Sequence, residues 1–206
     1  MATKKPTPLG LAVLSLLMER PMHPYEMMQL FIARHEDEIV KVKAGTLYHT
    51  VERLANRELI TAVGTERAGN RPERTSYRIT PAGRHLLRTE VTELLATPFN
   101  EYPRFPQALA EAHNLPLDVV IDQLGTRIEH FRAKLTLLRI GTEHLEARPL
   151  AKRLWLDVDY LRTMYSAELD WLTTLVEQLS DGNIEWTGSA RPAPHETRTD
   201  PDDTDA

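Results

Sequence analysis

The chain has 206 residues, of which 41% are hydrophobic and 27% are charged, and this is enough for one large domain or two small ones. It has no Cys and no apolar run of the roughly 18 to 20 residues that a membrane span needs, which argues against disulfide scaffolds, thiolate zinc sites, Cys nucleophiles and membrane helices. The net charge is −5, but residues 1–90 carry 14 Lys and Arg against 10 Asp and Glu while residues 91–206 carry 11 against 20, so any nucleic-acid contact is expected in the first half.

Three helices are expected before residue 58. The apolar run over residues 9–19, rich in Leu, predicts a buried helix that Pro21 ends. Pro24 can occupy the first turn of a second helix, whose residues 25–33 supply apolar side chains to pack on the first. After a polar connector, a third helix is predicted over residues 44–57.

The third helix has two faces. Leu47, Val51 and Leu54 recur at i, i+4 and i+7 and predict an apolar stripe that faces a core. The face expected to point outward carries Thr46, His49, Thr50 and Arg53. Such short hydrogen-bonding side chains with one Arg suit a helix that reads base edges in a major groove. Lys41 and Lys43 precede the helix, where they can meet phosphate together with its unpaired first-turn amides.

Two strands and a fourth helix are expected next. Residues 59–63 and 75–80 are rich in β-branched side chains, and the basic, Gly-containing stretch between them predicts a turn. Two short strands around a loop that contains Arg71 and Arg74 would form a wing. Thr80 then suits the N-cap, and Pro81 the first position, of a helix that runs on through Leu94.

The second half predicts two long helices after a Pro- and aromatic-rich joint at residues 98–106. The first carries a heptad seam of Leu117, Ile121, Leu124, Ile128, Phe131, Leu135 and Leu138. Pro149 breaks the pattern, and a second seam follows, with Glu168 on it, at Leu154, Val158, Leu161, Tyr165, Leu172, Leu175 and Leu179. The two seams can pack on each other within one chain or pair two chains. Residues 187–206 are polar, Pro-containing and acidic, which is typical of a disordered tail.

The fold class expected from these elements is mostly α. An N-terminal winged helix-turn-helix with a two-stranded wing would be followed by a C-terminal dimerisation domain of long antiparallel helices. The expected domains are residues 1–97 for DNA binding, 98–183 for dimerisation and 184–206 as the disordered acidic tail.

Two stretches carry more specific signatures. One is Gly45-Thr46-Leu47-Tyr48, followed by Arg53-Leu54 and Leu59-Ile60; the other runs from Arg71 to Gly83 as Arg-Pro-Glu-Arg-Thr-x-Tyr-Arg-Ile-Thr-x-x-Gly. They resemble, in that order, the recognition-helix and wing signatures of the PadR family of transcriptional regulators, over about the first 95 residues. The second half resembles the branch of that family with a virulence-activator-like helical domain, through its helix pattern and the stretch Ala-Glu-Leu-Asp-Trp-Leu at 167–172.

The chain departs from the family pattern at three positions. Pro24 stands where the family usually has Gly, Lys43 where it often has a capping Ser, and His49 where it usually has Pro. Because His49 lies on the expected reading face, individual base contacts do not transfer from the family. The resemblance implies a homodimeric regulator, usually a repressor, that binds a near-palindromic operator and is often released by a small molecule.

The predicted DNA-contacting residues are Tyr25, Lys41, Lys43, Thr46, Tyr48, His49, Thr50, Arg53, Arg71 and Arg74. Arg53 is the residue expected to read a base; its alternative is a salt bridge with Glu52 or Glu58. Tyr48 can donate its hydroxyl to phosphate or pack beside Ala55 in the core. Tyr25 can likewise contact DNA or pack between the first two helices. Arg71 and Arg74 are expected to touch phosphate or the minor groove.

The predicted dimerisation residues are Leu117, Ile121, Leu124, Ile128, Phe131, Leu135, Leu161 and Leu172. Phe131, Trp155, Tyr165 and Trp171 can line an effector pocket or simply form core. The eight His show no spacing typical of a metal site, and no cofactor is expected.

The sequence therefore predicts a ligand-responsive, DNA-binding repressor that works as a homodimer in the cytoplasm. Its expected partners are double-stranded DNA, a second copy and a small-molecule effector, without a membrane. The alternative is a helical dimeric interaction module without specific DNA binding, which the acidic second half favours. An enzyme is the weakest hypothesis, because the sequence has no phosphate-binding Gly loop and no nucleophile beside a base.

Overall fold

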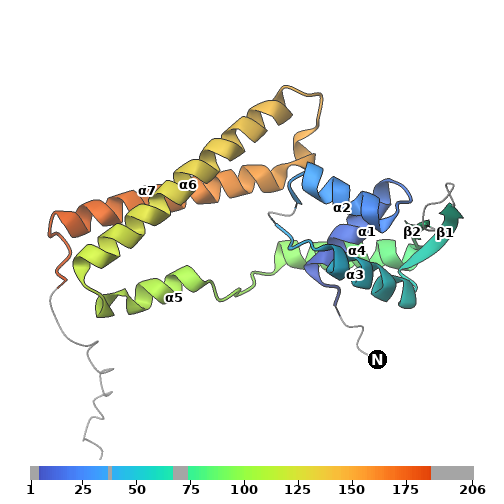
Figure 1. Cartoon of the computed structure of the whole chain (residues 1–206), viewed down its shortest axis with the longest axis horizontal. Helices are drawn as coiled ribbons and strands as arrows, with labels where there is room; N and C mark the ends of the chain where they lie inside the picture. The colour runs from blue at the N-terminus through green and yellow to red at the C-terminus, as the bar shows by residue number, and fades with distance from the viewer. Residues whose placement is uncertain (1–4, 37–38, 67–73, 187–206) are drawn as a thin grey trace, which may run out of the picture. The chain divides into compact units, whose positions relative to one another are not determined.

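The computed structural model describes residues 5–36, 39–66 and 74–186, and the chain divides into two compact units, Met1–Glu101 and Tyr102–Ala206. Each unit has its own hydrophobic core. The division lies within the joint expected at residues 98–106. Figure 1 shows the elements of both units.

The first unit is built on three helices, as the apolar pattern predicts: α1 (Pro8–Glu19), α2 (Pro24–Ala33) and α3 (Ala44–Asn56). Thr7 caps α1, because its hydroxyl oxygen accepts the Gly10 N–H at 3.2 Å. Arg34, directly after α2, holds the Glu19 carboxylate at the end of α1 in a two-pronged ion pair, and this hydrogen bonding lowers the pKa of Glu19. The core between the helices includes Leu14, Leu17, Met27, Phe31, Leu47, Val51 and Leu54.

The wing consists of β1 (Ile60–Glu66) and β2 (Arg74–Ile79), which pair antiparallel from Ile60 opposite Ile79 to Glu66 opposite Arg74, with an irregularity between Ala62 and Gly64. Both predicted strands are therefore present, and β1 is longer than expected. Met22, between α1 and α2, exchanges two backbone hydrogen bonds of 3.0 Å with Tyr77. These bonds fix the connection between the first two helices to the wing.

The junction between wing and fourth helix depends on Thr80 and Gly83. Thr80 caps α4 (Pro81–Ala96), because its hydroxyl oxygen accepts the Gly83 N–H at 3.1 Å, as predicted. The same hydroxyl donates toward the carbonyl oxygens of Glu58 and Leu59, at 2.8 and 3.0 Å. A Cβ added at Gly83 would lie 2.1 Å from the Leu59 carbonyl oxygen, so only Gly allows α4 to approach β1 this closely.

The second unit contains α5 (Arg104–Glu111), α6 (Leu117–Glu146) and α7 (Leu156–Ser180), with single 3-10 turns at Ala112–Asn114 and Lys152–Leu154. The two long helices pack against each other, as Figure 1 shows. The sequence pattern did not reveal α5, because prolines surround its start. Pro103 is its N-cap and Pro106 lies in its first turn, where a missing N–H costs no intrahelical hydrogen bond.

The two predicted seams pack on each other within the chain, which was one of the two alternatives left open. Leu124, Ile128, Leu172 and Leu179 are buried between α6 and α7. Both predicted seams are wrong in detail. Val120 on α6 is buried although it lies outside the first heptad pattern. Leu154, which belongs to the second predicted seam, is 61% exposed because α7 begins after it. The predicted mostly helical fold with a two-stranded wing and two long C-terminal helices is confirmed. None of the helices in the described ranges is long and apolar enough to cross a bilayer.

Candidate DNA-contacting surface

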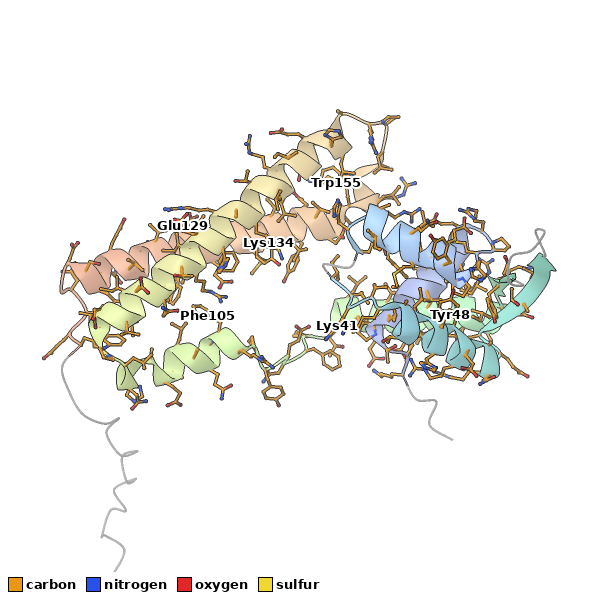
Figure 2. The ribbon with its side chains drawn as sticks, in the orientation of Figure 1. Lys41, Tyr48, Phe105, Glu129, Lys134 and Trp155 are labelled. Atoms are coloured by element: carbon orange, nitrogen blue, oxygen red, sulfur yellow. The ribbon has the colours of Figure 1, made fainter. Side chains whose placement is uncertain are left out.

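The start of α3 combines positive charge with backbone amides that no side chain caps. Lys43 is the N-cap residue and makes no side-chain hydrogen bond to the helix. Lys41 and Lys43 are both exposed, and Figure 2 shows Lys41 beside the start of the helix. Because first-turn amides carry partial positive charge, this end of α3 suits phosphate.

The outward face of α3 contains three of its four predicted residues. Thr46, His49 and Arg53 are exposed, but Thr50 is only 3% exposed, so its predicted exposed position is wrong. Thr50 lies three residues after Leu47 and four before Leu54, which places it at the edge of the apolar stripe. A Cβ built at Gly10 of α1 would lie 3.9 Å from the Thr50 methyl carbon. Thr50 therefore belongs to the contact between α1 and α3.

An acidic side chain, Glu52, also lies on the outward side of α3, next to His49, although the expected reading face contains only polar and basic residues. The side chains of His49 and Glu52 are 86% and 71% exposed, and 3.8 Å separates His49 Nδ1 from Glu52 Oε2. Glu52 could have been found from its spacing, because it follows His49 by three residues on the same exposed stripe. A carboxylate at this point repels phosphate but can accept a hydrogen bond from cytosine N4.

Arg53 is held by an unexpected partner. Its Nη2 donates to the Thr7 hydroxyl oxygen at 3.1 Å, so Arg53 connects α3 to the N-cap of α1. The expected alternative was an ion pair with Glu52 or Glu58. With its stem on the outward face and its tip at the start of α1, Arg53 is oriented before any ligand arrives.

The side chains of Tyr25 and Tyr48 are about half exposed to solvent. Their exposed fractions are 51% and 48%, and Figure 2 shows Tyr48 on α3. Tyr48 contacts His23 edge to face, with ring centroids 6.3 Å apart. His23 is the N-cap of α2, and its Nδ1 accepts the Tyr25 N–H at 3.0 Å. The sequence analysis did not select His23, although its place directly before Pro24 marks it as a cap.

The predicted wing contacts are only partly described. Arg71 lies outside the described residues, and Arg74 is described only through its backbone at the start of β2.

The predicted dimerisation residues fall into two groups, one buried and one half-buried. Leu124, Ile128 and Leu172 are buried in the chain's own α6–α7 contact, whereas Leu117, Ile121, Phe131, Leu135 and Leu161 are half-buried.

Of the predicted effector residues, Phe131 and Tyr165 are adjacent, because their rings meet edge to face with centroids 5.3 Å apart. Trp171 is 49% exposed and meets Phe105 of α5 instead, and Trp155 is 6% exposed.

Arg127, which the sequence pattern does not single out, connects the three helices of the second unit. The Arg127 guanidinium lies 3.6 Å from the ring centroid of Phe105 and 5.0 Å from that of Phe131. Its Nε donates to Glu168 at 3.0 Å, which explains the acidic residue on the second seam. Figure 2 labels Phe105 on α5. Within the described part of the chain, no three His, Asp or Glu side chains gather as a metal site would require.

Comparison with known protein families gives a match to part of the chain. Residues 13–89 match the Transcriptional regulator PadR-like family. No curated protein sequence matches the chain.

Solved structures show the same fold over most of the chain. Bacillus subtilis PadR in complex with operator DNA has a TM-score of 0.72 at 19% identity and covers 84% of this chain and 99% of its own. The same protein in complex with p-coumaric acid has a TM-score of 0.67 at 19% identity, with coverages of 84% and 98%. A PadR-like transcriptional regulator from Bacillus cereus has a TM-score of 0.60 at 21% identity, with coverages of 84% and 98%. The chain therefore contains a domain similar to the Transcriptional regulator PadR-like family at residues 13–89.

Proposed function

We propose that this regulator is a sequence-specific repressor that binds a near-palindromic operator as a homodimer and is released by a small molecule. In this proposal, residues 1–97 bind DNA, residues 98–183 dimerise and the protein works in the cytoplasm, with a regulatory and not a catalytic role. The observation that supports this proposal most is the outward face of α3, where Thr46, His49 and Arg53 are exposed. Two exposed lysines, Lys41 and Lys43, precede this face in the chain. Bacillus subtilis PadR, which shares the fold, has been crystallised on operator DNA.

Operator binding is tested with DNA from upstream of the protein's own gene. We expect a gel shift that survives competitor DNA and whose log affinity falls linearly with log salt concentration. Arg53→Ala and Lys43→Ala should each weaken binding, while Arg132→Ala, on the exposed surface of α6, should leave it unchanged. A wild-type protein that gives no competitor-resistant shift at moderate salt would contradict the proposal.

The second candidate is a helical interaction module that does not bind DNA specifically. The carboxylate of Glu52 on the outward side of α3 and the excess of acidic residues after residue 90 favour it. One experiment distinguishes the two candidate functions. The repressor loses its operator shift, but not its oligomeric state, when Arg53 is changed to Ala, whereas the module has no specific shift to lose.

A second copy is proposed to cover apolar side chains that the α6–α7 contact leaves outside. Leu137 and Ile140 on α6 are 71% and 49% exposed, and Tyr160 and Met164 on α7 are 63% and 46% exposed. A two-fold dimer would also place two α3 helices on one duplex, about 34 Å or one turn of DNA apart.

The proposed effector is a small aromatic molecule, and the proposed site contains Phe131, Trp155, Tyr165 and Trp171. Bacillus subtilis PadR binds p-coumaric acid, an aromatic carboxylate, which supports this class of ligand. Titration of the protein with p-coumaric acid should quench Trp fluorescence and release operator DNA. Trp171→Phe should reduce the quenching, because Trp171 is the more exposed of these two tryptophans.

A further inference from the structure

We propose that His23 is a positioning residue for DNA binding, which holds the Tyr48 ring in the orientation that the duplex requires and caps the helix that carries Tyr25. The inference rests on the proposed function and adds a residue outside α3 and the wing to the machinery that recognises DNA. It starts from two contacts of His23, with α2 and α3, and from the backbone pairing of its neighbour Met22 with β2.

The backbone at His23 is fixed on both sides. The preceding residue, Met22, is 1% exposed and is joined to Tyr77 of β2 by two backbone hydrogen bonds. The following residue, Pro24, is buried and begins α2. His23 therefore stands where the wing, α2 and the core meet, and its Cα has little freedom to move.

The imidazole ring is fixed as well. Nδ1 accepts the Tyr25 N–H at 3.0 Å, so Nδ1 carries no proton in this arrangement and the neutral ring has its proton on Nε2. The ring then meets the Tyr48 ring edge to face, with an interplanar angle of 71°. One side chain thus caps α2 and packs against the middle of α3.

The two tyrosines that His23 touches are suited to phosphate. Each is about half exposed, and each presents a hydroxyl donor on a rigid ring that loses little side-chain entropy on binding. An unsupported Tyr48 would sample several rotamers and would have to be ordered when DNA binds. Since an edge-to-face aromatic contact has a modest energy, its loss should weaken binding about two- to tenfold.

The test distinguishes two roles of the His23 side chain, which are packing of its ring on Tyr48 and capping of α2 by its Nδ1. His23→Asn keeps an N-cap acceptor for the Tyr25 N–H and removes the ring. In full-length protein, we expect it to keep the wild-type circular dichroism spectrum and to bind the upstream operator duplex about two- to tenfold more weakly. Tyr48→Ala should weaken binding by itself, and adding His23→Asn to it should have little further effect. Gln29→Ala, at an exposed position on α2, is the matched control.

Three outcomes overturn the inference. If His23→Asn binds the duplex as wild type does, His23 is only a helix cap. If the effects of His23→Asn and Tyr48→Ala are additive, the residues act independently of each other. If wild-type protein itself does not bind the duplex, the proposed function fails, and this inference fails with it.

Discussion

Gly83 is the residue at which the first unit tolerates least change. An added Cβ would lie 2.1 Å from the Leu59 carbonyl oxygen and 2.9 Å from Ile79 Cγ1, and the first of these neighbours is backbone. We therefore expect Gly83→Ala to lower the free energy of unfolding by about 1 to 3 kcal/mol, as overpacking does, in a urea titration. Gly125→Ala is the control, because a Cβ at Gly125 of α6 meets nothing within 4 Å and should stabilise the helix.

Glu52 gives a prediction about DNA and not about stability. Replacing its carboxylate removes a negative charge from the outward side of α3, so Glu52→Gln should bind non-specific duplex about two- to fivefold more tightly at moderate salt. Fluorescence anisotropy with a scrambled duplex measures this. Glu129→Gln, with a side chain 70% exposed on α6, should have no such effect. Unchanged or weaker binding by Glu52→Gln would mean that this face stays away from phosphate.

At the scale of elements, α5 is attached through Phe105 to side chains of α6 and α7. The helix has eight residues and none of them is buried, so it is too short to be stable alone. Phe105 attaches it through the Arg127 guanidinium and the Trp171 ring. The half-buried ion pair between Arg127 and Glu168 completes the connection to α7.

Arg127→Met tests this dependence, because it keeps the apolar stem and removes the charge. We expect it to destabilise the second unit by about 1 to 2 kcal/mol through the lost cation–π contact and ion pair. Arg132→Met removes an exposed ion pair with Glu129, three positions earlier on the same helix, and should cost at most about 0.5 kcal/mol. Chemical denaturation followed by Trp fluorescence measures both variants, and equal losses would refute a special role for Arg127.

At the scale of the whole molecule, we expect a second chain to cover the outer apolar side chains of α6 and α7. Leu137→Glu places a charge at a position that is 71% exposed in one chain, so it should leave the fold intact and prevent a second chain from packing there. We expect the mass measured by light scattering to fall from that of a dimer to that of a single chain. Thr136→Glu, at the neighbouring exposed position, should remain dimeric. A Leu137→Glu protein that stays dimeric would place the interface elsewhere.

The sequence by itself determined the order and type of most elements. Apolar spacing predicted α1, α3, α6 and α7, because the amphipathic period of a helix is written in neighbouring residues. Capping and turn chemistry predicted the start of α4 and the two strands, since Thr80, Pro81 and the Gly-containing turn act locally. These signals need no knowledge of distant contacts.

Only the tertiary structure decided which faces are covered. Thr50 lies at the edge of the apolar stripe of α3, and only the approach of α1 to that edge buries it. Arg53 binds Thr7, 46 residues away, and Arg127 lies between rings from α5 and α6, so neither partner could be read from local spacing. Burial and pairing depend on which element packs on which, and that is a property of the folded chain.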